Sequence, residues 1–300
     1  MTPSPESWQA AGRYFDFRGR RVFIRTDGPA GAPALLLIHG FPTASWDWCR
    51  LWPELAATHR LVAADMLGLG FSAKPRGHRY TVAEQADLFV AALAEAGIGE
   101  AAVLAHDLGD TVAQELIARA LEGRLPVKLR GVILLNGGLF PETHRPVLLQ
   151  RLLLSPLGPL IARLSSRARL GASLTQIAGD LKPTAAELDA MWLLMSRDGG
   201  LAALPRLIRY MVERRDNRER WVGALQRCPV PLAIVNGSAD PISGAHMVAR
   251  LRELAIPADI AELPGVGHYP QIEAPAAVLA AVRRALATMP ACSFETGLRA

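Results

Sequence analysis

The sequence predicts an α/β fold: a mostly parallel, doubly wound sheet of eight strands, with a helical cap inserted after the sixth strand. Short apolar runs alternate with helical patterns up to residue 138. Between residues 139 and 222 no strand-like run appears, and helical segments follow one another. Strand-like runs then return. We therefore expect a core made of residues 1–138 and 223–300, interrupted by a helical cap at residues 139–222.

The composition excludes several classes of protein. Half of the 300 residues are hydrophobic, which is enough for a substantial buried core and excludes a disordered chain. The net charge of +5 comes mostly from arginines spread along the chain, so we expect no nucleic-acid partner. Residues 1–11 lack the basic and then apolar pattern of a signal peptide. The apolar run at 147–162 is interrupted by polar residues and prolines, so no membrane span is expected.

The cysteines indicate a reducing environment. Cys49, Cys228 and Cys292 are odd in number and stand in no metal-binding spacing. This pattern argues against a disulfide framework, and we expect a cytoplasmic protein without a metal site.

The first strands form the edge and then the middle of the predicted sheet. Residues 14–17 and 22–25 form a short antiparallel hairpin, whereas residues 34–38 are uniformly apolar, as in a strand covered on both faces. Residues 61–64 form the next strand and lead into a glycine-rich loop without phosphate-binding spacing. Thr81 and Glu84 then form a capping box for a helix that ends near Gly97.

The pentapeptide Ala105-His106-Asp107-Leu108-Gly109 follows an apolar strand and precedes a helical pattern. Small residues two positions before and after the centre allow a sharp strand-to-helix turn, as in the nucleophile elbow of α/β-hydrolases, here with Asp107 in place of serine. A carboxylate is suited to displacing a leaving group at saturated carbon, which gives an alkyl ester on Asp107. Alternatively, Asp107 only caps the following helix. Taken alone, the pentapeptide fits both interpretations.

The predicted cap follows the strand at residues 131–135. Its leucine stripe lines a pocket or docks the cap, and we favour docking. The stripe consists of Leu148, Leu149, Leu152, Leu153, Leu157 and Leu160. Four arginines near the end of the predicted cap are expected to form a solvated face: Arg214, Arg215, Arg218 and Arg220.

The last two strands supply partners for the nucleophile. Residues 232–235 lead to Asp240, and residues 258–263 lead to His268. Either residue alone fits a helix cap or an ordinary loop histidine. However, Asp107, Asp240 and His268 each follow a strand end, in the order nucleophile, acid, histidine that belongs to this fold. We therefore expect a catalytic triad.

The sequence resembles the epoxide hydrolase and haloalkane dehalogenase branch of the α/β-hydrolases along nearly its whole length. Within that branch it is similar to the mesoderm-specific transcript family. The similarity rests on four stretches: His106-Asp107 with Gly109-Asp110, residues 136–146 (NGGLFPETHRP), residues 220–225 (RWVGAL) and residues 268–271 (HYPQ).

This resemblance implies a two-step hydrolysis. Asp107 attacks carbon, and His268, oriented by Asp240, then activates the water that cleaves the ester. The backbone N–H groups of Phe41 and Leu108 form the oxyanion hole. No metal or organic cofactor is needed.

The leaving group distinguishes the possible substrates. A dehalogenase of this branch has Trp directly after the nucleophile, where this chain has Leu108. Asn136, where some dehalogenases place the acid of the triad, cannot carry charge. Opening an epoxide needs an acid, normally two tyrosines of the cap, and Tyr210 is the single tyrosine of this cap. His144 is a further donor of the cap.

Three functions remain open. We expect an epoxide hydrolase that acts on a small apolar organic substrate and water; the alternatives are a haloalkane or haloacid dehalogenase, and a hydrolase-fold binding protein with an idle triad. His39, His144 and Tyr269 are expected to contact the substrate. We expect a monomer or homodimer, and we do not predict contact with a membrane surface.

Overall fold

The computed structural model describes residues 2–290, so Cys292 and the last ten residues of the second core segment lie outside it. Its centre is one sheet of eight strands in the order β1-β2-β4-β3-β5-β6-β7-β8. The strands are β1 (Arg13–Phe17), β2 (Arg20–Asp27), β3 (Ala34–Ile38), β4 (Arg60–Ala64), β5 (Glu100–His106), β6 (Lys128–Leu135), β7 (Leu232–Gly237) and β8 (Asp259–Leu263).

The pairing of the strands confirms the predicted fold class. β1 and β2 are antiparallel, β2 and β4 are antiparallel, and every other neighbouring pair is parallel. The hairpin turns at Arg18 and Gly19, both with positive φ, which is the backbone conformation of a tight hairpin loop. All five residues of β3 are buried, because helices cover the central strands on both faces.

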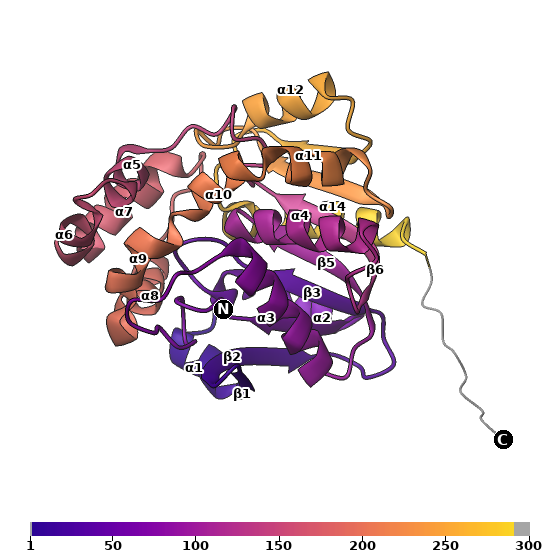
Figure 1. The fold of residues 1–300 in the computed structure, drawn as a ribbon, viewed down its shortest axis with the longest axis horizontal. Coiled ribbons are helices and arrows are strands. Elements are labelled where there is room, and N and C mark those ends of the chain that lie inside the picture. The colour runs from indigo at the N-terminus through magenta and orange to yellow at the C-terminus, as the bar shows by residue number, and fades with distance from the viewer. Residues whose placement is uncertain (1, 291–300) are drawn as a thin grey trace.

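Helices of the core pack on the two faces of the sheet (Figure 1). α3 (Val82–Glu95) and α4 (Leu108–Leu121) lie side by side on one face, and α14 (Pro275–Ala287) covers the other. The remaining core helices are α1 (Pro5–Ala10), η1 (Ser45–Trp48), α2 (Trp52–Ala56), α12 (Ala245–Glu253) and α13 (Pro270–Glu273).

Thr81 caps α3, but the predicted capping box is incomplete. The Thr81 hydroxyl accepts a hydrogen bond from the backbone N–H of Glu84. The Glu84 carboxylate instead contacts Arg20 at 3.2 Å and His78 at 2.6 Å. The contacts with Arg20 and His78, which lie outside α3, hold the carboxylate away from the start of the helix.

A continuous helical segment connects β6 to β7; most of its helices lie beyond one end of the sheet, whereas the last one packs beside α4 (Figure 1). It contains α5 (Leu148–Leu154), α6 (Gly158–Arg163), α7 (Arg167–Ile177), α8 (Ala185–Ser196), η2 (Arg197–Gly199), α9 (Gly200–Leu207), α10 (Tyr210–Asp216) and α11 (Arg218–Gln226). At the start of α8 the capping box of Thr184 and Glu187 is complete. Among residues 2–290, none of the helices combines the length and apolar character that crossing a membrane requires.

Candidate active site

A single residue makes the turn from the central strand into its helix. β5 ends at His106 and α4 begins at Leu108, so Asp107 alone reverses the direction of the chain. Its φ of 52° and ψ of −108° lie outside the regions that non-glycine residues ordinarily occupy. Strain of this kind persists where the surrounding packing enforces it.

Two glycines allow the chain to approach this turn closely. A Cβ atom at Gly109 would lie 2.3 Å from the backbone oxygen of Ile38. A Cβ atom at Gly40 would lie 2.8 Å from Cβ of Asp107. Both contacts are closer than carbon atoms tolerate, so the loop after β3 can meet the turn only because these residues lack side chains.

The Asp107 carboxylate points toward the loop that follows β3. Its Oδ2 accepts a hydrogen bond from the backbone N–H of Phe41 at 3.0 Å, and the residue is buried. The side chain makes no capping hydrogen bond to α4, so the capping alternative is not what the structure contains. Leu108 is the first residue of α4, and its N–H therefore has no partner within the helix.

His268 and Asp240 lie beside this carboxylate. His268 Nε2 is 3.9 Å from Asp107 Oδ1, and its Nδ1–H donates to Asp240 Oδ2 at 2.8 Å. All three side chains are buried. They follow β5, β7 and β8, whose carboxyl ends meet at one edge of the parallel sheet. The structure thus brings together the three residues that the sequence analysis proposed as a triad.

The charges of the group are coupled. Burial alone would lower the pKa of His268, but the negative charges of Asp240 and Asp107 outweigh it and raise that pKa to about 9. Burial alone would raise the pKa of Asp240, but the positive charge of His268 and hydrogen bonds from His268 and Asn136 lower it to about 2. The ion pair of His268 and Asp240 is therefore favoured at neutral pH.

Side chains that the sequence analysis did not assign to the site hold Asp240. Asn136 Nδ2 donates to Asp240 Oδ2 at 3.0 Å, and Ser243 Oγ lies 2.8 Å from the same oxygen. The backbone N–H of Ile242 donates to Oδ1 at 2.8 Å. Asn136 has a φ of 44°, which asparagine tolerates better than most residues. Nothing in the local sequence marks Ser243 for this role.

His106, next to the nucleophile position, supports the histidine loop. Its Nε2–H donates to the backbone oxygen of His268 at 2.7 Å. Burial and the positive charge of His268 lower the pKa of His106 to about 4, so its ring is neutral at neutral pH. The sequence contained one signal of this role, the position directly before Asp107.

Two polar groups from the helical segment between β6 and β7 lack partners within the described residues. The Tyr210 hydroxyl and both ring nitrogens of His144 are buried without a hydrogen-bond partner. Burial and the charge of Asp107 raise the pKa of Tyr210. Burial and then the positive charge of Arg214 lower the pKa of His144 to about 3. The Tyr210 ring lies 6.0 Å from the ring of Phe41, whose backbone N–H donates to the Asp107 carboxylate.

The structure corrects the expectation that Arg214 belongs to a solvated face. Arg214 is only 3% exposed, because its guanidinium reaches inward to the strained turn. Its Nε donates to Thr111 Oγ1 at 2.6 Å and its Nη2 donates to the backbone oxygen of Asp107 at 3.1 Å. Its guanidinium also stacks over the Tyr210 ring at 4.7 Å. Arg218, by contrast, is outward and pairs with Glu142 at 2.6 Å.

His39 and Tyr269 differ in position, although both were expected to contact substrate. His39 is fully buried, with Nδ1 2.8 Å from the oxygen of Gly40 and Nε2 accepting from the N–H of Met66 at 2.9 Å. Both nitrogens are occupied by backbone, so His39 braces the loop rather than facing substrate. Tyr269 lines the cavity described next, and its ring contacts those of His106 and His268.

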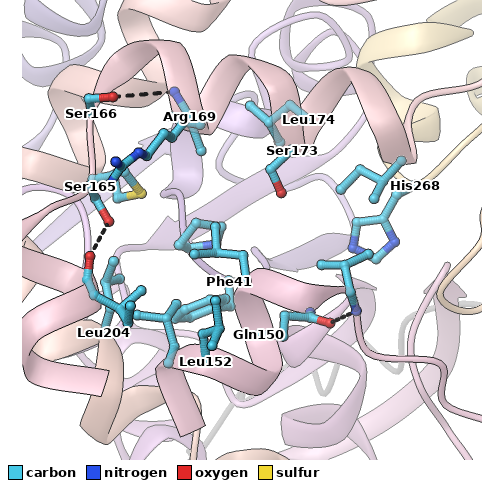
Figure 2. Close-up of a pocket in the computed structure, with 18 of the residues that line it drawn as sticks. Phe41, Gln150, Leu152, Ser165, Ser166, Arg169, Ser173, Leu174, Leu204 and His268 are labelled. Atoms are coloured by element: carbon cyan, nitrogen blue, oxygen red, sulfur yellow. Dashed lines mark hydrogen bonds between the residues drawn. The ribbon is translucent and has the colours of Figure 1, made fainter. Parts of the chain in front are cut away.

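The lining of an apolar cavity of about 400 Å³ includes His268, Phe41 and Tyr269. Figure 2 shows His268 at one end and Arg169 with Ser166 at the other. The expectation that most of the leucine stripe docks the cap does not hold. Three of the six leucines line this cavity: Leu149, Leu152 and Leu153. The other three are exposed: Leu148, Leu157 and Leu160.

Comparison with known proteins extends the similarity found in the sequence. Residues 35–282 match the model of the alpha/beta hydrolase family. The putative hydrolase LipZ of Mycobacterium tuberculosis is 42% identical over 92% of this chain and 96% of its own. The bovine mesoderm-specific transcript homolog protein is 38% identical over 92% of this chain and 85% of its own.

Solved structures share the fold at low sequence identity. A haloalkane dehalogenase DbeA-M1 loop variant from Bradyrhizobium elkanii has a TM-score of 0.78, with 22% identity over 92% of this chain and 96% of its own. Cfl2 from Burkholderia cenocepacia has a TM-score of 0.75, with 24% identity over 91% of this chain and 94% of its own. At such identities these likenesses describe the fold. Taken with the family model and the two relatives, they lead to one conclusion: the chain belongs to the alpha/beta hydrolase family.

Proposed function

We propose that this hydrolase opens epoxides to diols through a covalent ester on Asp107. One observation carries the proposal: a buried carboxylate stands where the fold presents its nucleophile, hydrogen-bonded to Phe41 and 3.9 Å from the His268 imidazole. A carboxylate in that position attacks saturated carbon and forms an ester that a histidine-activated water can cleave. We also propose that residues 139–222 act as the cap of the substrate site.

In the first step, Asp107 Oδ1 bonds to a ring carbon while the bond from that carbon to the epoxide oxygen breaks. The oxygen leaves as an alkoxide and takes a proton from the Tyr210 hydroxyl, with a second hydrogen bond from the His144 ring. The charge of Asp107 contributes to the raised pKa of Tyr210. That charge disappears as the ester forms, so Tyr210 becomes a better acid at the moment when a proton is needed.

In the second step, His268 takes a proton from water, and the resulting hydroxide adds to the ester carbonyl of Asp107. The N–H groups of Phe41 and Leu108 stabilise the oxyanion, which collapses to the alkoxide of the diol and a protonated Asp107 carboxyl. The carboxyl proton passes to the alkoxide, which leaves as the diol, and the proton on His268 returns to the Tyr210 phenolate. Esterification has by then removed the nearby negative charge that helped to raise the pKa of His268. The neutral imidazole required of a base is therefore easier to reach after the first step.

The residues around the leaving group favour an epoxide over a halide. Leu108 offers no side-chain N–H to a departing halide, whereas Tyr210 and His144 are buried donors without partners among the described residues. The apolar cavity supports an apolar substrate. Cys49 and Cys228 are free thiols, which supports the proposed cytoplasmic location.

The decisive experiment traps the ester. His268→Gln cannot activate water, so the intermediate should accumulate on Asp107 and be visible by intact-protein mass spectrometry. An epoxide adds its full mass, because no atom leaves, whereas a haloalkane adds its mass less that of the hydrogen halide. The size of the adduct therefore separates epoxide hydrolase from dehalogenase.

Two control variants make the trap specific. His59→Gln, at a half-buried histidine outside the site, should turn over substrate without accumulating ester. Asp107→Asn should form no adduct with any substrate. If His268→Gln forms no ester across panels of epoxides and haloalkanes while remaining folded, the triad is idle and the proposal fails.

A further inference from the structure

Exposed apolar side chains gather on the outer part of the helical segment. Among residues 2–290, seven large hydrophobic side chains are exposed, and four of them lie on or next to α5 and α6. We call the exposed side chains of this region the α5–α6 surface: Leu148, Arg151, Leu157, Leu160, Arg163 and Leu164. Figure 1 shows α5 and α6 at the outer edge of the molecule, away from the sheet.

The leucines of this surface form a stripe. Leu157, Leu160 and Leu164 are spaced by three and four positions, which places them on one side of α6. They are 60%, 53% and 53% exposed, and Leu148 at the start of α5 is 70% exposed. Apolar patches of this kind on a folded protein mark sites of interaction.

The charge around the leucines has one sign. From residue 143 to residue 179 the chain contains five arginines and no Asp or Glu. Arg167 pairs with Asp189 of α8. Arg151 and Arg163 form no ion pair within residues 2–290, and both are exposed. The surface therefore offers unpaired positive charge beside exposed leucines.

One residue of the α5–α6 surface also lines the apolar cavity. Leu164 and Arg169 line the cavity, and Figure 2 shows Arg169 at the end opposite His268. Leu149 and Leu152, on α5, line it from within. An apolar interior thus continues outward to exposed leucines flanked by arginines.

We propose that the α5–α6 surface docks on the surface of a lipid membrane that contains anionic lipids. Leucines inserted below the headgroups and arginines beside lipid phosphates satisfy both halves of the pattern. A second copy of the chain fits less well, because a symmetric contact would bring the unpaired arginines of both copies together. Docking also lets an apolar substrate pass from the bilayer into the cavity, a consequence that rests on the proposed function.

Flotation with vesicles tests the docking without depending on catalysis. We expect the protein to float with vesicles of phosphatidylcholine and phosphatidylglycerol, less with phosphatidylcholine alone, and less again as salt is added. Leu148→Ser/Leu157→Ser/Leu160→Ser should weaken binding to the anionic vesicles by about tenfold or more. Arg151→Glu/Arg163→Glu should weaken it by about tenfold or more at low salt.

Matched controls use exposed residues elsewhere. Leu181→Ser, at a leucine that is 65% exposed outside this surface, and Arg76→Glu/Arg227→Glu should leave vesicle binding unchanged. Absence of binding to anionic vesicles, or equal binding by the triple serine variant, overturns the proposal. A dimer of the wild type that the triple serine variant loses, measured by light scattering, assigns the surface to a second copy and overturns it as well. None of these outcomes alters the ester-trapping result.

Discussion

The contacts of Asp240 define the expected outcome of Asp240→Asn. Its Oδ2 accepts from His268 Nδ1 and Asn136 Nδ2 and lies 2.8 Å from Ser243 Oγ. Within residues 2–290, Oδ1 accepts only from the N–H of Ile242. An amide has one acceptor oxygen, which will face the larger group of donors. His268 then keeps its Nδ1–H and its tautomer. The substitution therefore removes the negative charge without reorienting the ring.

The size of the effect follows from this charge. Two unit charges about 4 Å apart interact by about 4 kcal/mol at an effective dielectric constant of about 20. We expect hydrolysis of the ester to slow by about 10³-fold, because its transition state carries an imidazolium that Asp240 stabilises. Ester formation should change little, so ester accumulates. The Ile242 N–H left unpaired should lower the free energy of unfolding by about 1–3 kcal/mol.

Rapid-quench mass spectrometry measures the two steps separately, and nitrogen NMR of the histidine ring reports its pKa and tautomer. The pKa of His268, raised to about 9 in the wild type, should fall in the variant. Ser243→Ala keeps the carboxylate and should retain most of the activity. The reasoning is refuted if ester hydrolysis keeps its wild-type rate in Asp240→Asn, or if the pKa of His268 does not fall.

Three further predictions follow from contacts around the triad. Asn136→Asp in the Asp240→Asn background returns a carboxylate to the same cluster and should recover part of the hydrolysis rate, measured by rapid quench; no recovery would contradict it. The pKa of His106 is lowered to about 4, so stability should fall as pH drops from about 6.5 through about 4, where the unfolded chain binds more protons. Urea unfolding should show a shallower pH slope in His106→Gln, and an unchanged slope would count against this assignment. Gly40→Ala places a Cβ atom 2.8 Å from Cβ of Asp107 and should lower both turnover and unfolding free energy, the latter by about 1–3 kcal/mol; wild-type values for both would be the contrary result.

The strand-linked features of the site could be predicted because they depend on local sequence. Asp107, Asp240 and His268 each follow a strand end, and parallel strands bring such ends to one edge of the sheet. The positions of Arg214 and His39 could not be predicted in this way. Arg214 is buried because α10 crosses the turn at Asp107, and His39 is turned away because the backbone of Gly40 and Met66 occupies its ring.

The leucine stripe illustrates the same limit. Helical spacing predicts which leucines share a face, but not what that face meets. Leu152 lines the cavity and Leu148 is exposed, although both belong to α5. Only the packing of α5, α6 and α9 against one another decides between the two.

The hydrogen bond from Arg214 to the backbone of Asp107 bears on how substrate enters. It ties α10 to the strained turn at Asp107, so movement of this helix would disturb the position of Asp107. We expect α10 to stay fixed during turnover, while α5 to α7 move and form the gate through which the substrate enters. Amide hydrogen exchange would then be slow along α10 and faster along α5 to α7, and rapid exchange at α10 would rule out this division between anchor and gate.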